Sequence, residues 1–86
     1  MHTVDLLDEA VALAERLGYR VRHDWLGGTS GGGCEIRGHR WIFLDLALTP
    51  AEQLEQVLAT LRREPAVTNL PMAQALRDCL VLRKSA

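Results

Sequence analysis

Three side chains near the middle of the chain have types that suit covalent or metal chemistry: His23, Cys34 and His39. A cysteine acts as a nucleophile when a nearby imidazole or a helix N-terminus lowers the pKa of its thiol. Cys34 follows three glycines, and His23 lies on the preceding predicted strand. One hypothesis is therefore a thiol enzyme in which Cys34 is the nucleophile and His23 the base, with backbone amides of the glycine segment as an oxyanion hole.

A metal site is a second hypothesis for the same three residues. Zinc needs three or four ligands that converge on one point. The sequence has neither a C-x-x-C nor an H-E-x-x-H motif, and His39 falls in a predicted turn while Cys34 points toward aromatic residues. We therefore interpret Cys34 and His23 as packed within the fold. We expect neither a metal nor another cofactor.

A glycine-rich segment before Cys34 is the candidate ligand-binding loop; it comprises Gly27, Gly28, Thr29, Ser30, Gly31, Gly32 and Gly33. Glycine-rich turns hold phosphate when their amides converge, usually at the start of a helix. This segment instead joins two predicted strands and lacks the G-K-[ST] ending of a P-loop. It predicts a crossover where backbone passes close to backbone, with contact to a ligand or partner peptide as the alternative.

Arginines accompany tryptophans on the predicted strands, a combination that can bind single-stranded nucleic acid. They are Arg20, Arg22, Arg37 and Arg40, with Trp25 and Trp41. Asp24 and Glu35 dilute this charge, and 10 basic against 11 acidic residues give a net charge of -1. We therefore do not expect nucleic acid as a partner.

Paired carboxylates for acid–base catalysis have little support, because Asp24 and Asp45 lie on different predicted strands. Asp45 shares the aromatic face of its strand and is expected to be partly buried. Backbone donors would then have to satisfy its carboxylate. We expect Asp45 to bind loop amides at the end of the strand.

These side chains depend on elements that the apolar spacing predicts. Residues 3–17 form an amphipathic helix with Thr3 as its N-cap and Gly18 as its stop. Residues 19–25 alternate as a half-buried strand that places Tyr19, Val21, His23 and Trp25 on one face.

A hairpin is predicted over residues 34–46, with arms 34–37 and 40–46 and a two-residue type II′ turn at Gly38-His39. That register places Ile36 opposite Trp41 and Cys34 opposite Phe43. Residues 41–44 are apolar on both sides, which is typical of a central strand covered on both faces. The 40–46 segment is therefore expected in the middle of a three-stranded sheet.

Two further helices follow. Thr49, Pro50 and Glu52 have the spacing of a capping box with proline at the first helical position. Residues 64–70 are expected to be a linker, and Pro71 opens a last helix that runs to about Arg83. Cys79 lies on the apolar stripe of that helix, which is wider than one neighbour needs, so we expect the helix to pack on a partner subunit.

The predicted order α-β-β-β-α-α defines a small α+β fold in which a three-stranded sheet with a β-hairpin is packed by one N-terminal and two C-terminal helices. The chain of 86 residues is expected to be a single domain over 1–86. Its polar, acidic N-terminus and short apolar runs predict a cytoplasmic protein without a membrane segment.

The stretch G-G-G-C-E-I-R-G at 31–38, followed by a strand and a helix that begins L-T-P-A-E-Q at 48–53, resembles short uncharacterised bacterial proteins with a glycine-rich turn and a G-G-G-C-x-x-x-G hairpin. That resemblance implies membership without an activity. The element order also resembles the N-terminal half of minimal zinc peptidases. Their helix supplies two histidines and a glutamate base, whereas residues 51–61 contain no histidine, so no peptidase residue carries over.

Together these patterns predict a non-enzymatic module that self-associates as a homodimer or binds another protein. The alternatives are a small-molecule or metal binder that uses the glycine segment with Cys34 and His23, and a thiol enzyme on Cys34.

Overall fold

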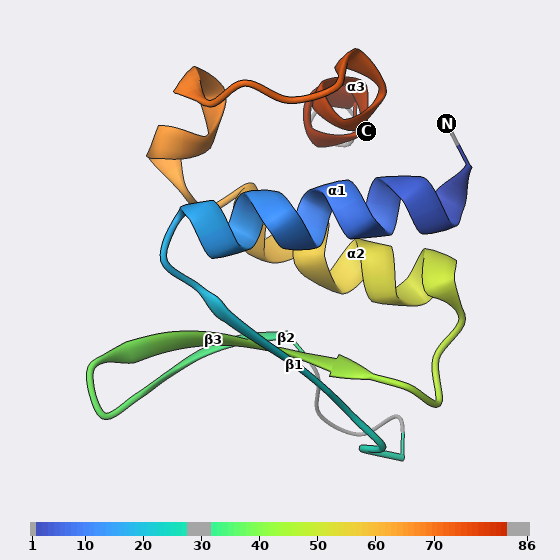
Figure 1. The fold of residues 1–86 in the computed structure, drawn as a ribbon, viewed down its shortest axis with the longest axis vertical. Coiled ribbons are helices and arrows are strands. Elements are labelled where there is room, and N and C mark those ends of the chain that lie inside the picture. Colours follow the sequence, from blue (N-terminus) through green and yellow to red (C-terminus); the bar gives the residue numbers. More distant parts are fainter. Residues whose placement is uncertain (1, 28–31, 83–86) are drawn as a thin grey trace.

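The order of elements follows the α-β-β-β-α-α pattern that the sequence predicts, with one short additional helix. The computed structural model describes residues 2–27 and 32–82. Its elements are α1 (Thr3–Arg16), β1 (Arg20–Asp24), β2 (Gly32–Ile36), β3 (His39–Asp45), α2 (Pro50–Leu61), the 3-10 helix η1 (Pro65–Asn69) and α3 (Gln74–Leu82). They stack in three layers: the sheet, then α1 beside α2, then η1 with α3 (Figure 1).

β3 is the central strand of the three-stranded sheet, as its apolar sequence predicts. The strand order is β1-β3-β2. β1 pairs with β3 in parallel, and β2 pairs with β3 in antiparallel orientation. β1 and β2 are therefore both edge strands, on opposite sides of β3.

The two faces of β3 have different surroundings. Ile42 and Leu44 are fully buried in the cluster that α1 and α2 form over the sheet. Trp41 and Phe43 point to the opposite face and are only partly buried. The expectation that both faces are covered is wrong, because the helices described here all lie on one side of the sheet (Figure 1).

The hairpin turn differs from the predicted one by one position. Arg37 and Gly38 are the two turn residues, and both have positive φ, 52° and 80°. Positive φ at both positions is the type I′ geometry, whose twist matches that of the flanking strands. Ile36 therefore lies opposite His39, and Cys34 opposite Trp41. Each residue of β2 thus faces a β3 residue two positions earlier than predicted. Because side chains alternate between faces with a period of two, Cys34 and Ile36 keep the face that the sequence predicts.

The helices largely follow the sequence signals. Thr49 and Glu52 form the predicted capping box, and Pro50 is the first residue of α2. Gly18 follows α1 with the expected positive φ. The N-cap of α1 is His2 rather than Thr3, and its side chain makes no capping hydrogen bond.

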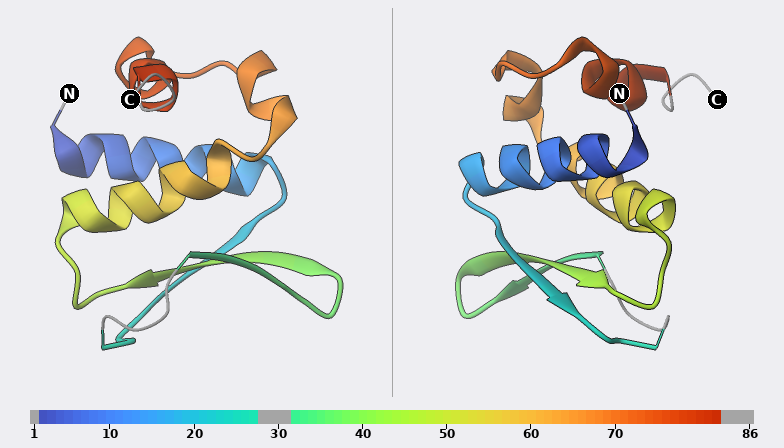
Figure 2. Two further views of the ribbon diagram at one scale, coloured as in Figure 1. Left: turned by 180° about the vertical axis from the view of Figure 1, so that it is seen from behind. Right: turned by 45° about the vertical axis from the view of Figure 1, so that its right-hand side comes forward.

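α3 packs against its own chain. It begins at Gln74 rather than at Pro71, and η1 occupies most of the segment predicted as a linker. Leu76 and Leu80 are buried in the same core as α1 and α2, and both views in Figure 2 keep those two helices between α3 and the sheet. The apolar stripe of α3 is thus used within the chain, at least in part.

The sheet approaches α2 closely where β2 carries glycine. A Cβ atom on Gly33 would lie 2.9 Å from the hydroxyl oxygen of Thr60 and 3.0 Å from its methyl group. Thr60 is nearly buried, and its hydroxyl donates to the carbonyl of Gln56 at 3.3 Å. The close approach of α2 therefore explains why residue 33 is a glycine.

We predict that Gly33→Ala destabilises the fold by about 1–3 kcal/mol, because the added methyl overpacks the contact with Thr60. Chemical denaturation measures the change. In a Thr60→Ala background the same substitution should be neutral or slightly stabilising, since the space is free and alanine restricts the unfolded chain. Equal costs in the two backgrounds would contradict this explanation.

Candidate functional site

The three residues proposed for covalent or metal chemistry are all exposed. Cys34 lies on β2, His23 on β1 and His39 at the start of β3. The interpretation of Cys34 and His23 as packed residues is wrong. Both lie on edge strands, and Cys34 faces the side of the sheet that no described helix covers.

The sheet keeps Cys34 and His23 apart. β3 separates their strands, and Cys34 aligns with Trp41 whereas His23 aligns with Leu44. Trp41 and Leu44 point to opposite faces of β3, so the thiol and the imidazole do as well. Among the described residues, no group of three or more His, Cys, Asp or Glu side chains could hold a metal ion.

The candidate ligand loop is described only at its ends. Gly28, Thr29, Ser30 and Gly31 lie outside the described residues. Gly27 and Gly32 flank them with φ of 70° and 103°. The expected close backbone approach is found at Gly33, against Thr60.

The helix-free face of the sheet gathers aromatic and basic side chains. The rings of Trp41 and Phe43 stack at 5.6 Å between centroids, with 10° between their planes. The guanidinium carbon of Arg20 lies 5.7 Å from the centre of the Trp41 ring. By register Arg22 is beside Phe43, and its Nε atom is 3.6 Å from a carboxylate oxygen of Asp24. We call these four residues (Arg20, Arg22, Trp41 and Phe43) the aromatic-basic face.

Not all the residues expected on this face are present. Arg40 and Glu35 align with each other across the hairpin and lie on the helix side of the sheet. The strand predicted over residues 19–25 is shorter in the structure: β1 ends at Asp24, and Trp25 lies beyond it with 71% of its surface exposed. Glu35 therefore does not dilute the charge of the aromatic-basic face, whereas Asp24 and the buried Asp45 lie on its side of the sheet at the ends of β1 and β3.

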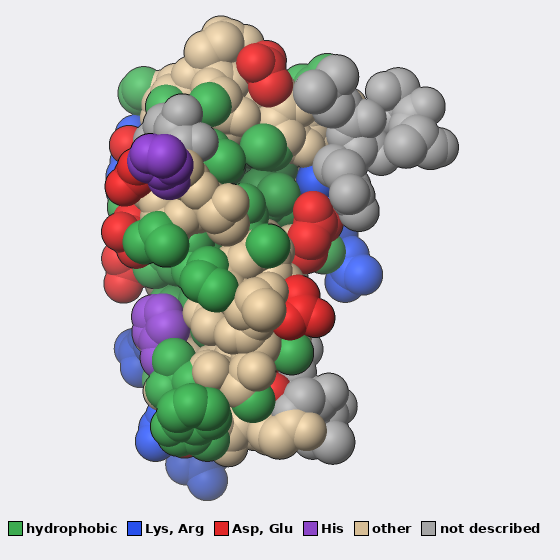
Figure 3. Space-filling view, turned by 90° about the vertical axis from the view of Figure 1, so that its right-hand side faces the viewer, with side chains coloured by type: hydrophobic (Ala, Val, Ile, Leu, Met, Phe, Trp, Pro, Cys, Tyr) green, Lys and Arg blue, Asp and Glu red, His purple; other side chains and the backbone are tan. Residues whose placement is uncertain are grey.

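One group of acidic side chains lies on α1, on a different element from Arg20 and Arg22. Asp5, Asp8 and Glu9 line a shallow hollow on α1, whereas Arg20 and Arg22 lie on the sheet. Figure 3 shows acidic side chains along one margin and again on the opposite side, where basic ones lie beside them, with further basic side chains at the foot of the view. Although the net charge of the chain is -1, Arg20 and Arg22 place positive charge on this face of the sheet.

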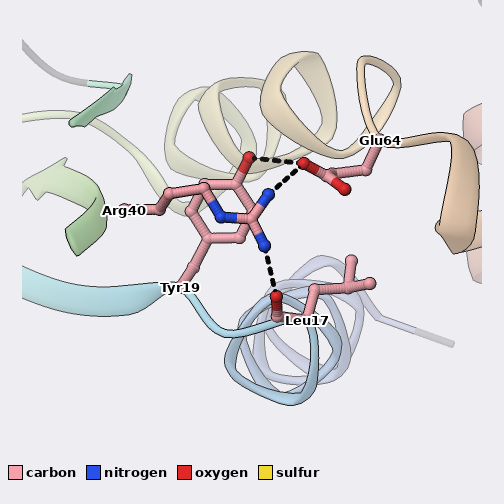
Figure 4. A network of polar contacts seen from close by, with 4 residues as sticks. All are labelled: Leu17, Tyr19, Arg40 and Glu64. Atoms are coloured by element: carbon pink, nitrogen blue, oxygen red, sulfur yellow. Dashed lines mark hydrogen bonds and ion pairs between the residues drawn. The ribbon is translucent and has the colours of Figure 1, made fainter. Parts of the chain in front are cut away.

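Arg40 joins three elements on the helix side. Its guanidinium stacks over the Tyr19 ring at 4.4 Å, donates to the carbonyl of Leu17 and pairs with the carboxylate of Glu64 (Figure 4). The Tyr19 hydroxyl donates to the same Glu64 oxygen at 3.2 Å. This network fixes the end of α1, the start of β3 and the segment between α2 and η1. No sequence motif marks it.

Asp45 is fully buried at the end of β3. Its Oδ1 atom accepts backbone N–H bonds from Leu26 at 3.0 Å and from Ala47 at 2.9 Å. The prediction that Asp45 binds loop amides is confirmed. The carboxylate holds the segment after β1 against the turn after β3.

We predict that the phenol of Tyr19 titrates above its ordinary pKa of 10.0, because burial raises this pKa and the negative charge of Glu64 raises it further, against the opposing charge of Arg40. Tyr19 is the chain's single tyrosine, so phenolate absorbance reports it directly. The folded state holds this proton more tightly than the unfolded chain, so the phenol should lower stability as the pH rises beyond about 10.

Glu64→Gln should move the midpoint of this titration back toward 10.0, because the negative charge is gone. Glu15→Gln, on the exposed surface of α1, is the control and should leave it unchanged. A phenol that titrates at or below 10.0 in the native protein would contradict the burial and charge assigned to it.

We further predict that Asp45→Ala costs about 1–3 kcal/mol of stability, since it removes the acceptor of two partly buried backbone N–H groups. Chemical denaturation compares it with Asp24→Ala. Asp24 is half-exposed, and its side chain accepts a hydrogen bond from the backbone N–H of Trp25 at 2.9 Å. If the two substitutions cost the same, Asp45 does not join the loops as described.

Comparison with known proteins finds no relative of this chain. No protein-family model, no curated protein and no solved structure matches the chain. The likeness to glycine-turn bacterial proteins and to zinc peptidases therefore stays a prediction. Within residues 2–27 and 32–82, the structure has no helix that is both long enough and apolar enough to cross a membrane.

Proposed function

We propose that this chain is a small non-enzymatic protein-binding module that self-associates by strand addition at the free edge of β2. The observation that carries the proposal is the contrast between the two edge strands. β2 (Gly32–Ile36) contains one charged side chain, Glu35, and no proline. Such an edge presents unpaired backbone groups to any strand that can approach it.

The opposite edge is protected by charge. β1 carries Arg20, Arg22 and Asp24 among its five residues. Charged side chains on an edge strand disfavour pairing with another chain. Strand addition is therefore favoured at β2.

The register identifies the backbone groups that would pair. Ile36 and His39 close a two-residue hairpin, so their pair is a hydrogen-bonded one, and such pairs alternate along the ladder. The N–H and C=O groups of Gly33 and Glu35 then point away from β3. A second copy of β2 in antiparallel orientation would present the same groups, as an isologous dimer requires.

Self-association through α3 has less support than the sequence suggests. Leu76 and Leu80 already pack within the chain. Val81 remains 60% exposed on this helix. We therefore place the association at the sheet edge.

The alternative functions also have less support. A thiol enzyme needs a base near Cys34, and His23 lies on the other face and the other edge of the sheet. A metal or small-molecule site that uses Cys34 and His23 has the same difficulty, because the two side chains lie on opposite faces of the sheet. Neither arrangement offers converging side chains.

Sedimentation velocity tests the proposal at micromolar concentrations. We expect a dimer for the native chain and a monomer for Glu35→Pro, because proline removes the outward N–H without removing a bond to β3. Glu35→Ala is the matched control, since it removes the same side chain and keeps the N–H, and it should stay dimeric. Thermal unfolding verifies that each variant is folded.

A native chain that is monomeric throughout, or a folded Glu35→Pro variant that still dimerises, would refute association through β2.

A further inference from the structure

The aromatic-basic face has a regular arrangement across the sheet. Each aromatic ring of β3 has an arginine beside it on β1: Arg20 aligns with Trp41, and Arg22 with Phe43. On the β2 side the aligned residues are small, Cys34 beside Trp41 and Gly32 beside Phe43. Each ring is thus flanked by a cation on one side and by little side-chain volume on the other.

The rings have small neighbours on the β2 side. Both rings are only partly buried, although they are large and apolar. No described helix covers this face (Figure 1). Neither residue that aligns with the two rings on β2 has a large side chain.

The arginines on this face favour an anionic ligand. Arg20 has no salt bridge among the described residues, and Arg22 meets Asp24 only through a contact at 3.6 Å between exposed side chains. Such exposed ion pairs are weak, so Arg22 can exchange the Asp24 carboxylate for a phosphate at little cost in free energy. Arg37 lies at the hairpin end of the same sheet and adds positive charge.

A ligand that repeats a flat ring and a negative charge satisfies both features. Single-stranded nucleic acid does so, because its bases stack on aromatic side chains and its phosphates pair with arginine. An acidic peptide would satisfy the arginines alone, and an apolar peptide the rings alone. The net charge of -1 does not oppose binding at this face, because much of the negative charge lies elsewhere, partly on α1.

We propose that the aromatic-basic face binds single-stranded nucleic acid, with bases stacked on Trp41 and Phe43 and phosphates held by Arg20 and Arg22. The face lies on the sheet surface and not at its edge. The proposal therefore does not depend on pairing through β2.

Fluorescence anisotropy of labelled oligo(U), about ten nucleotides long, tests the proposal at about 20 mM salt. We expect binding that weakens with salt, with a log–log slope of about -1.4 for two phosphates on a single strand. Arg20→Ala and Arg22→Ala should each reduce the slope by about 0.7. Arg63→Ala, exposed on the helix layer, is the matched control and should change neither slope nor affinity.

Stacking is tested by Phe43→Leu, which keeps an apolar side chain but removes the π face. It should weaken binding by about ten-fold. In a Trp25→Phe background Trp41 is the remaining tryptophan, and its fluorescence should be quenched by oligo(U).

Three results would overturn the proposal. The first is no binding by the folded native chain at low salt. The second is equal binding of duplex RNA, whose bases are not free to stack on the rings. The third is equally effective competition by poly-glutamate of matched charge, which would show that the arginines recognise charge without bases.

Discussion

The sheet depends on the double pairing of β3. β1 and β2 do not touch as neighbours, so each is held in the sheet by its bonds to this one strand. Ile42 and Leu44 of β3 are fully buried beneath α1 and α2. The strand is therefore fixed by hydrogen bonds on both sides and by the helices on one face. Every exposed side chain on the sheet takes its position from that arrangement.

The helices that the structure describes all lie on one face of the sheet (Figure 1). Small domains bury a smaller fraction of their surface than large ones. Here the third helix packs on the other two rather than on the sheet (Figure 2). Trp41 and Phe43 consequently stay partly exposed, and stacking against each other shields part of their surface. Partly exposed aromatic rings on a sheet face that no described helix covers favour a binding surface over a plain exterior.

Polar contacts fix the ends of the strands. Asp45 joins the segments that follow β1 and β3. At the other end of β3, Arg40 holds the end of α1 and the segment after α2 through Leu17 and Glu64. These contacts lie at both ends of the central strand, so they position the aromatic-basic face without taking part in it.

Local signals in the sequence determined much of the fold. The capping box at Thr49 and Glu52, the stop at Gly18 and the apolar run at 41–44 each act over a few residues, and the structure contains all three. The role of Asp45 was also predictable, because a carboxylate at a strand end beside loop amides has few other satisfactory partners. The turn was missed by one position, since Arg37 adopts a left-handed conformation that is uncommon for a residue with a side chain.

Tertiary structure alone decided which face of the sheet is open and which residues meet. A sequence shows that two faces of a strand are apolar but not that the helices are too few to cover both. The separation of His23 from Cys34 follows from β3 entering between their strands, which depends on long-range pairing. In the Arg40 network Tyr19 bonds directly to Glu64, 45 positions further along the chain. Local spacing carries no information about such contacts, because they form only when the sheet and the helices pack together.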